Sequence, residues 1–138
     1  MKDFHYFGLF LEDEVKIKLY SFLLSFLHEN NISLILFDDY TILDHCTLLH
    51  VSQLHGNSEI YNYLNDRIGE KYEIVINGIG ISDKAITFRV AEYSVVCVNE
   101  VPHITIATFN GGKPVDSNNI TEWKDIEPII IKTTLKKV

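Results

Sequence analysis

The sequence predicts an α+β domain in which helices pack against antiparallel β-sheet. Three observations support this prediction. Short apolar and aromatic runs typical of buried strands recur along the chain, two segments carry apolar residues at helical spacing, and no linker, repeat-rich tract or charge block interrupts the pattern. A chain of 138 residues is expected to form a single domain over residues 1–138.

The first half begins with a strand and a long helix. Residues 6–11 are aromatic and aliphatic, and the acidic Glu12-Asp13-Glu14 that follows suits the first turn of a helix. Apolar residues then share one helical face up to Asn30-Asn31. The apolar run 32–37 is expected to be a strand or a buried connection.

A strand is next predicted over 43–51. A second helix should begin at Asn57-Ser58, bury Ile60, Leu64 and Ile68, and end at Gly69. The rest of the chain is expected to form strands at 72–76, 85–90, 94–98, 103–109 and 129–135. Gly78, Gly80 and 82–84 should form the bend after the first of these, and 111–114 a loop.

Two of the predicted strands carry the same short pattern, His45-Cys46-Thr47 and His103-Ile104-Thr105. Side chains two apart in a strand point to the same face, so each histidine lies beside a threonine while Cys46 and Ile104 point into packing. If the strands are adjacent, two imidazoles and two hydroxyls line one cleft.

Such a set of side chains suits phosphodiester cleavage. One histidine can take a proton from the attacking oxygen and the other can give one to the leaving oxygen. The threonine hydroxyls can donate hydrogen bonds to the phosphate oxygens. A single His-x-Thr is weak evidence, since a lone strand histidine is usually a packed or surface residue, but two copies in apolar strands favour the paired interpretation.

A metal site is the competing interpretation of the histidines. Zinc sites gather three or four ligands at short spacing, and the chain contains neither H-E-x-x-H nor C-x-x-C. No cofactor or metal is therefore predicted.

The two motifs, His45-Cys46-Thr47-Leu48 and His103-Ile104-Thr105-Ile106, make the chain resemble the 2H phosphoesterase superfamily, which includes LigT-like 2′,5′-RNA ligase and cyclic phosphodiesterase proteins. The opening strand and helix, the strand leading into Gly78-Ile79-Gly80 and the stretch 111–118 support the resemblance, which covers nearly the whole chain.

The resemblance implies a bilobal fold in which two antiparallel sheets form a central cleft with helices packed outside. It implies that His45 and His103 are the catalytic acid and base and that Thr47 and Thr105 hold the phosphate. Known substrates of the family carry 2′-linked or 2′,3′-cyclic phosphates, among them RNA ends, 2′,5′-oligoadenylate and cyclic dinucleotide signals, and some viral members cleave such signals to blunt host immunity.

Several further residues are candidates around the cleft. Lys113, after Gly111-Gly112, could contact phosphate or base, or be part of a plain surface turn. Tyr6 and Phe109 could stack on a base. Asp44 could orient His45 or lie on the surface. His50 is an odd number of residues from His45 and is expected on the opposite face.

Charge and composition bear on the partners. The net charge of −7 argues against a protein that coats long nucleic acid and favours a small nucleotide or an RNA end held in a pocket. No apolar run reaches membrane-spanning length, and two cysteines are too few for a disulfide framework. We therefore expect a cytoplasmic monomer, in the host cytoplasm if the chain is viral, without a membrane partner.

These observations predict a metal-independent phosphodiesterase. The favoured substrates are a cyclic dinucleotide such as 2′,3′-cyclic GMP–AMP, or 2′,5′-oligoadenylate. Two alternatives stay open: an enzyme that opens 2′,3′-cyclic phosphates on RNA ends, and a nucleotide-binding module that sequesters its ligand without turnover.

Overall fold

The apolar runs of the sequence form six strands in a computed structural model that describes residues 4–32, 42–93 and 96–138. The strands are β1 (Tyr6–Leu11), β2 (His45–His50), β3 (Lys71–Ile81), β4 (Ala85–Tyr93), β5 (His103–Thr108) and β6 (Trp123–Lys137). The helices are α1 (Asp13–Glu29) and α2 (Ser58–Asn65), with short 3-10 helices η2 (Val51–Gln53) and η3 (Pro114–Asn119).

The strands close into one antiparallel barrel in the order β1-β2-β5-β4-β3-β6, with β6 pairing back to β1. The predicted bilobal α+β fold with two sheets is therefore wrong. Every strand of the described residues has a neighbour on both sides, which leaves no second sheet among them. The joint between β2 and β5 is the shortest and rests on the single pair Cys46↔Ile104.

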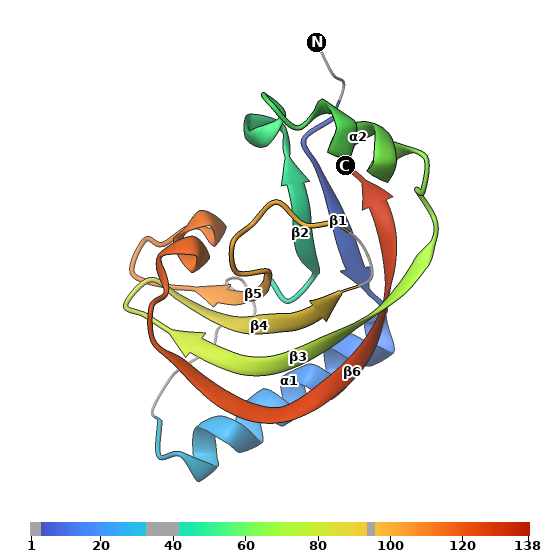
Figure 1. Ribbon diagram of the computed structural model, residues 1–138. Helices are drawn as coiled ribbons and strands as arrows, with labels where there is room; N and C mark the ends of the chain where they lie inside the picture. Colours follow the sequence, from blue (N-terminus) through green and yellow to red (C-terminus); the bar gives the residue numbers. More distant parts are fainter. Residues whose placement is uncertain (1–3, 33–41, 94–95) are drawn as a thin grey trace.

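The length of two strands explains this difference. β3 was expected over 72–76 and β6 over 129–135, but both are longer, and β6 pairs with β1 and β3 together. In Figure 1 these two strands curve across the whole molecule. Gly78 and Gly80 lie inside β3 rather than in a bend, so the bend is confined to the residues between β3 and β4.

One face of the strands packs against the helices to form the core. Leu19, Leu23 and Leu27 are the buried residues of α1, and Phe22 of that helix meets Phe88 of β4 with ring centroids 6.4 Å apart. Figure 1 shows α1 crossing behind β3 and β6, with α2 near the C-terminal end of β6. The opposite face of β2 and β5 lines a pocket.

Some local predictions differ from the structure. α2 ends at Asn65, before Ile68, which is exposed. Residues 96–98 are not a strand, while 94–95 and most of the apolar run 32–37 lie outside the described residues. The loop predicted at 111–114 runs directly into η3. In the described part of the chain, neither helix combines the length and apolar character needed to cross a membrane.

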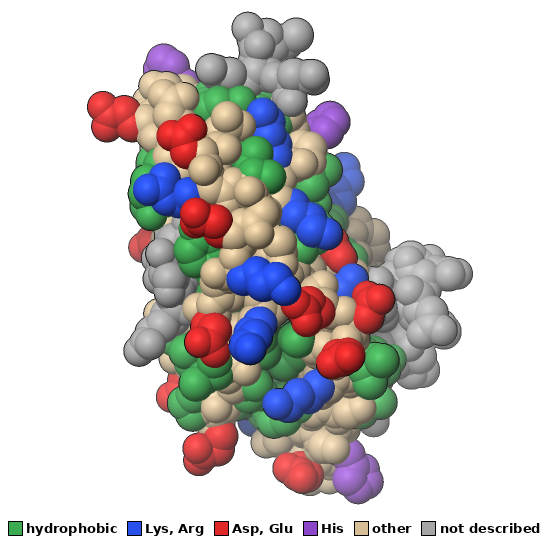
Figure 2. Space-filling view, turned by 90° about the vertical axis from the view of Figure 1, so that its right-hand side faces the viewer, with side chains coloured by type: hydrophobic (Ala, Val, Ile, Leu, Met, Phe, Trp, Pro, Cys, Tyr) green, Lys and Arg blue, Asp and Glu red, His purple; other side chains and the backbone are tan. Residues whose placement is uncertain are grey.

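The face at the right of Figure 1 carries charges of both signs. Figure 2 shows lysine and arginine side chains interspersed with aspartate and glutamate on this face. Along β6 the exposed residues alternate in the same way, with Lys124 beside Asp125 and Glu127 a little further on. This mixture gives the face no single-sign field to attract a long polyanion.

Candidate active site

The pairing of β2 with β5 brings the two His-x-Thr motifs together. Since Cys46 lies opposite Ile104 in an antiparallel pair, the side chains on either side of them share the opposite face of the sheet. All four residues of the motifs, His45, Thr47, His103 and Thr105, line one pocket of about 440 Å³. The sequence could say only that the motifs would share a cleft if their strands were adjacent. In the structure the two strands are adjacent.

The remaining lining of this pocket comes from five parts of the chain. β1 supplies Tyr6, and the stretch leading into β2 supplies Ile42. The end of β2 and η2, the segment before β5, and η3 supply the rest: His50, Ser52, Gln53, Asn99, Pro114, Val115 and Asn118. We call this space the main pocket.

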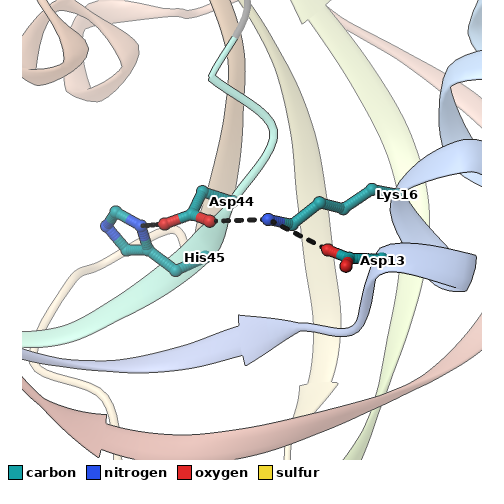
Figure 3. A network of polar contacts seen from close by, with 4 residues as sticks. All are labelled: Asp13, Lys16, Asp44 and His45. Atoms are coloured by element: carbon teal, nitrogen blue, oxygen red, sulfur yellow. Dashed lines mark hydrogen bonds and ion pairs between the residues drawn. The ribbon is translucent and has the colours of Figure 1, made fainter.

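A chain of charged groups orients His45 (Figure 3). Its Nδ1 lies 3.3 Å from Oδ2 of Asp44, whose Oδ1 accepts a hydrogen bond from Nζ of Lys16 at 2.9 Å. Asp13 lies 4.0 Å from the same Nζ. A carboxylate can only accept, so Nδ1 of His45 carries a proton and Nε2 is left for the pocket. Asp44, which could have been a surface residue, thus orients the imidazole.

Burial and charge set the proton affinities of this pair. Burial lowers the pKa of His45, and the hydrogen bond and charge of Asp44 oppose the shift only in part. Burial raises the pKa of Asp44, but the hydrogen bonds from Lys16 and His45 outweigh it and leave the pKa below its usual value. The carboxylate therefore stays ionised beside a largely neutral imidazole.

Two aromatic rings hold the His45 imidazole from β1. Its ring centroid lies 4.7 Å from that of Tyr6 and 4.9 Å from that of Phe10, both in stacked orientation. Gly8 lies between these residues in β1, and a Cβ there would meet atoms of all three rings at 3.2–3.3 Å. Glycine is thus the residue that lets the three rings lie close over the strand.

His103 is held by the backbone. Its Nδ1 lies 2.9 Å from the carbonyl oxygen of Val101, which can only accept, so Nδ1 is protonated. Burial lowers its pKa, and the bond to Val101 offsets this only in part. Both imidazoles therefore leave Nε2 as the nitrogen available for proton transfer.

Thr105 belongs to a chain of three buried hydroxyls. Oγ of Ser117 in η3 lies 2.8 Å from Oγ1 of Thr105 and 2.7 Å from Oγ1 of Thr87 in β4. Each hydroxyl has one hydrogen, so the two bonds use two of the three. If Thr87 donates to Ser117 and Ser117 to Thr105, the third hydrogen is directed from Thr105 into the main pocket.

Sequence reasoning missed His50. It lines the main pocket because the pairing of β1 with β2 shifts between Phe7 and Gly8, where one extra residue of β2 reverses the alternation. Leu48 and Leu49 are both buried, which places His50 on the side of His45. Two successive leucines were the only signal of a bulge. Nδ1 of His50 accepts a hydrogen bond from the backbone N–H of Ser52 at 3.1 Å.

The predicted substrate-binding residues are placed differently from one another. Tyr6 lines the main pocket, whereas Lys113 and Phe109 are outside its lining. Lys113 is exposed before η3, and its backbone N–H donates to Oδ2 of Asp116 at 2.8 Å. Phe109 is half-buried and packs against the hydrophobic core. Across the described residues, no group of three or more His, Cys, Asp or Glu side chains is placed to hold a metal ion.

Comparison with known proteins shows the fold. No family model matches the chain, and no curated protein sequence matches it significantly. Among solved structures, the chain is similar to one titled "Crystal Structure of Fungal RNA Kinase", with a TM-score of 0.65 and 16% sequence identity. The match covers 97% of this chain and 45% of the fungal protein, so this chain spans less than half of that protein's length.

Proposed function

We propose that this chain is a two-histidine phosphodiesterase that hydrolyses 2′-linked or cyclic nucleotides without a metal. The observation that carries the proposal is the β2–β5 pairing, which gathers His45, Thr47, His103 and Thr105 in one pocket. The resemblance of the two motifs to 2H phosphoesterases supports the reaction class. The fold likeness to a fungal RNA kinase adds support for chemistry on nucleotide or RNA phosphates.

The reaction needs one neutral and one protonated imidazole. Nε2 of the neutral histidine takes a proton as the water or ribose hydroxyl oxygen attacks phosphorus, and Nε2–H of the other gives its proton to the ester oxygen whose bond to phosphorus breaks. The number of protons on the pair is conserved. Asp44 and the carbonyl of Val101 hold the two Nδ1–H groups while this happens.

The threonine hydroxyls can serve the phosphate oxygens, on which negative charge builds during the reaction. In this proposal Thr47 and Thr105 donate to the non-bridging phosphate oxygens, where negative charge grows in the transition state. The bond to Ser117 fixes Thr105 before substrate arrives, so its hydroxyl needs little reorganisation. A positioned donor of this kind is typically worth about 10²–10³ in kcat.

Small nucleotides are the favoured substrates. The net charge of −7 and the mixed charges of the face in Figure 2 are poorly suited to long RNA. A main pocket of about 440 Å³ has the size of a small-molecule site. A cyclic dinucleotide such as 2′,3′-cyclic GMP–AMP, or 2′,5′-oligoadenylate, is therefore the substrate class that we propose.

RNA end processing is the second candidate. The fold likeness to the fungal RNA kinase favours it, since that protein's title names RNA. An enzyme that opens 2′,3′-cyclic phosphates on RNA should turn over oligonucleotides faster than cyclic dinucleotides. Its rate should also fall steeply with salt, because each phosphate contact releases counterions.

The test is a panel of substrates in the presence of EDTA. Cyclic dinucleotides, 2′,5′-oligoadenylate, 2′,3′-cyclic mononucleotides and RNA ending in a cyclic phosphate are each incubated with the protein. Turnover in EDTA is the expected result, and the fastest substrate identifies the class. Activity that EDTA abolishes and a divalent ion restores would contradict a metal-independent mechanism. The absence of turnover with every substrate would contradict the proposal that the chain is an enzyme.

Substitution of the histidines tests the mechanism. His45→Asn and His103→Asn should each lower kcat by about 10²–10⁴-fold while nucleotide binding persists. His55→Asn is the matched control, because His55 is exposed and is not part of the pocket lining. Nucleotide binding by the wild-type protein without any turnover would instead identify a module that sequesters its ligand.

A further inference from the structure

A second hollow adjoins the main pocket. It has a volume of about 320 Å³ and shares the amide side chains Gln53, Asn99 and Asn118 with the main pocket. Its other wall carries Trp123, the single tryptophan of the chain. We call this hollow the side pocket. A ligand whose phosphate lies at the histidines can reach it by passing over the three amides.

Hydrogen bonds fix the orientation of two of these amides. The backbone N–H of His50 donates to Oε1 of Gln53 at 2.9 Å, so Nε2 of Gln53 faces Oδ1 of Asn99 at 3.1 Å. Nδ2 of Asn99 in turn donates to the carbonyl oxygen of Thr47 at 3.3 Å. Both ends of this relay are backbone groups that cannot reverse. Each amide nitrogen has two hydrogens and uses one here, which leaves one on each for a ligand.

The indole of Trp123 is equally well fixed. Trp123 pairs with Gly80 of the neighbouring strand β3, and a Cβ on Gly80 would come within 2.7 Å of two atoms of the indole. The ring therefore lies directly over a strand position that has no side chain. The guanidinium carbon of Arg89 lies 5.7 Å from the ring centre. A rigid aromatic surface beside hydrogen-bond donors suits a flat, polar, aromatic ligand.

The charge in the side pocket favours a nucleobase over a second phosphate as its ligand. Glu100 lines the side pocket, and an ionised carboxylate accepts hydrogen bonds but repels a phosphate. A nucleobase offers N–H groups to the carboxylate, carbonyl and ring nitrogen acceptors to the amides, and a face to the indole. Amide and carboxylate side chains are among the groups that read the edge of a base.

We propose that the side pocket is a nucleobase subsite that takes the base of a nucleotide whose phosphodiester lies at His45 and His103. This inference rests on the proposed phosphodiesterase function and deepens it, since it assigns the part of the substrate next to the cleaved bond. It makes a nucleoside-bearing diester the preferred substrate over a diester without a base.

The fluorescence of Trp123 reports the occupancy of this subsite directly. The double variant His45→Asn/His103→Asn keeps the tryptophan and is titrated with a dinucleoside monophosphate and with ribose 5-phosphate. The dinucleoside monophosphate should change the emission in a saturable way, and ribose 5-phosphate should not. Binding of the dinucleotide by calorimetry without any change in emission would overturn the subsite.

Kinetics give the second readout. The ratio of kcat/KM for a dinucleotide to that for bis(p-nitrophenyl) phosphate should fall about tenfold in Trp123→Leu, as expected for the loss of one base-stacking contact. Tyr20→Leu in α1, which lines neither pocket, is the matched control and should leave the ratio unchanged. An unchanged ratio in Trp123→Leu contradicts the subsite alone.

The two proposals fail differently. If the wild-type protein hydrolyses neither a 2′,5′-linked dinucleotide nor any other substrate of the panel above, the phosphodiesterase function fails, whatever the tryptophan reports. If it hydrolyses bis(p-nitrophenyl) phosphate but the emission of Trp123 ignores a bound dinucleotide, the function stands and the nucleobase subsite is wrong.

Discussion

At the residue level, the carboxylate of Asp44 decides which nitrogen of His45 is available. Asp44→Asn removes the two contributions that raise the pKa of His45, so this pKa should fall further below its usual value. The new amide can also donate to Nδ1 and leave the proton on Nε2, the wrong tautomer for a base. We expect kcat to fall by about 10²–10⁴-fold, by analogy with other carboxylate–histidine pairs.

Two measurements check this prediction. NMR titration of the imidazole follows the pKa of His45, and steady-state kinetics follow kcat. Asp13→Asn is the matched control, because Asp13 contacts Lys16 at 4.0 Å but makes no contact with His45. If Asp44→Asn behaves like Asp13→Asn, the contact between Asp44 and His45 has no catalytic role.

Gly8 sets the position of the same imidazole from the other side. In Gly8→Ala the added methyl group meets ring atoms of Tyr6, Phe10 and His45 at 3.2–3.3 Å, so the rings must move by a few tenths of an ångström. Misplacement by about 1 Å can cost about 10² in rate, so we expect a smaller loss, about threefold to tenfold in kcat. Thermal unfolding checks that the fold is intact, and an unchanged kcat would show that the rings absorb the methyl group without moving His45.

At the level of elements, η3 is attached to the barrel by one buried side chain. Ser117→Ala removes the centre of the hydroxyl chain and leaves Thr87 and Thr105 without their shared partner. We expect the free energy of unfolding to drop by about 1–3 kcal/mol, with a lower kcat because Thr105 is no longer held. Ser21→Ala, at an exposed position of α1, is the control and should change neither quantity measurably. Urea denaturation gives the first value and kinetics the second.

Local patterns predicted some elements well and others poorly. β1 and α1 were predictable because the apolar run and the helical spacing act within one segment. The reach of α2 was overestimated because Ile68 fits the helical spacing but follows the last helical turn. The position of His50 depends on a bulge against β1, and a bulge is a property of two paired strands that a single-strand pattern does not contain.

The candidate site shows the same division between local and tertiary information. The His-x-Thr pairs could be found because strand alternation is local. Asp44 could be named as a candidate because it adjoins His45 in the chain. Gly8 and Ser117 instead act through contacts between segments distant in the chain, which no spacing reveals. Trp123 begins β6 and lines the side pocket, with Gly80 of β3 as its partner in the strand pairing, and this neighbour is likewise a tertiary contact.

At the level of the whole molecule, barrel closure was beyond the reach of sequence patterns. Periodicity located most of the strands, but the length of β3 and β6 is set by pairing along both edges. Glycines at 78 and 80 looked like a bend, yet within β3 they make room for the side chains of Arg89 and Trp123. The two sheets implied by the resemblance are one barrel here, because β6 pairs with both β1 and β3 and so closes the sheet.

The pH dependence of activity should reflect the burial of both imidazoles. Turnover needs one protonated and one neutral histidine, so kcat/KM should follow a bell-shaped curve. The pKa values of His45 and His103 are both lowered from 6.5, mainly by burial. We therefore expect the midpoint of the alkaline limb to lie below about pH 6.5, which is the pH where an exposed imidazole titrates. A plateau of full activity above that pH would contradict acid catalysis by either histidine.

The same lowered pKa values make stability depend on pH with a definite sign. The pKa values of both histidines are lower in the folded protein than the value of about 6.5 in the unfolded chain. At a pH between these values the unfolded chain binds more protons than the folded protein. The free energy of unfolding therefore falls as the pH falls through this window. The contribution is fully present above 6.5 and lost below the folded pKa values. Urea denaturation at about pH 5 and about pH 7.5 should show the loss in the wild type. His45→Asn/His103→Asn should lose less stability between the two pH values, because it lacks both groups. An equal loss in the two proteins would assign the pH dependence to other residues, and the barrel would then gain no stability from keeping this pair neutral.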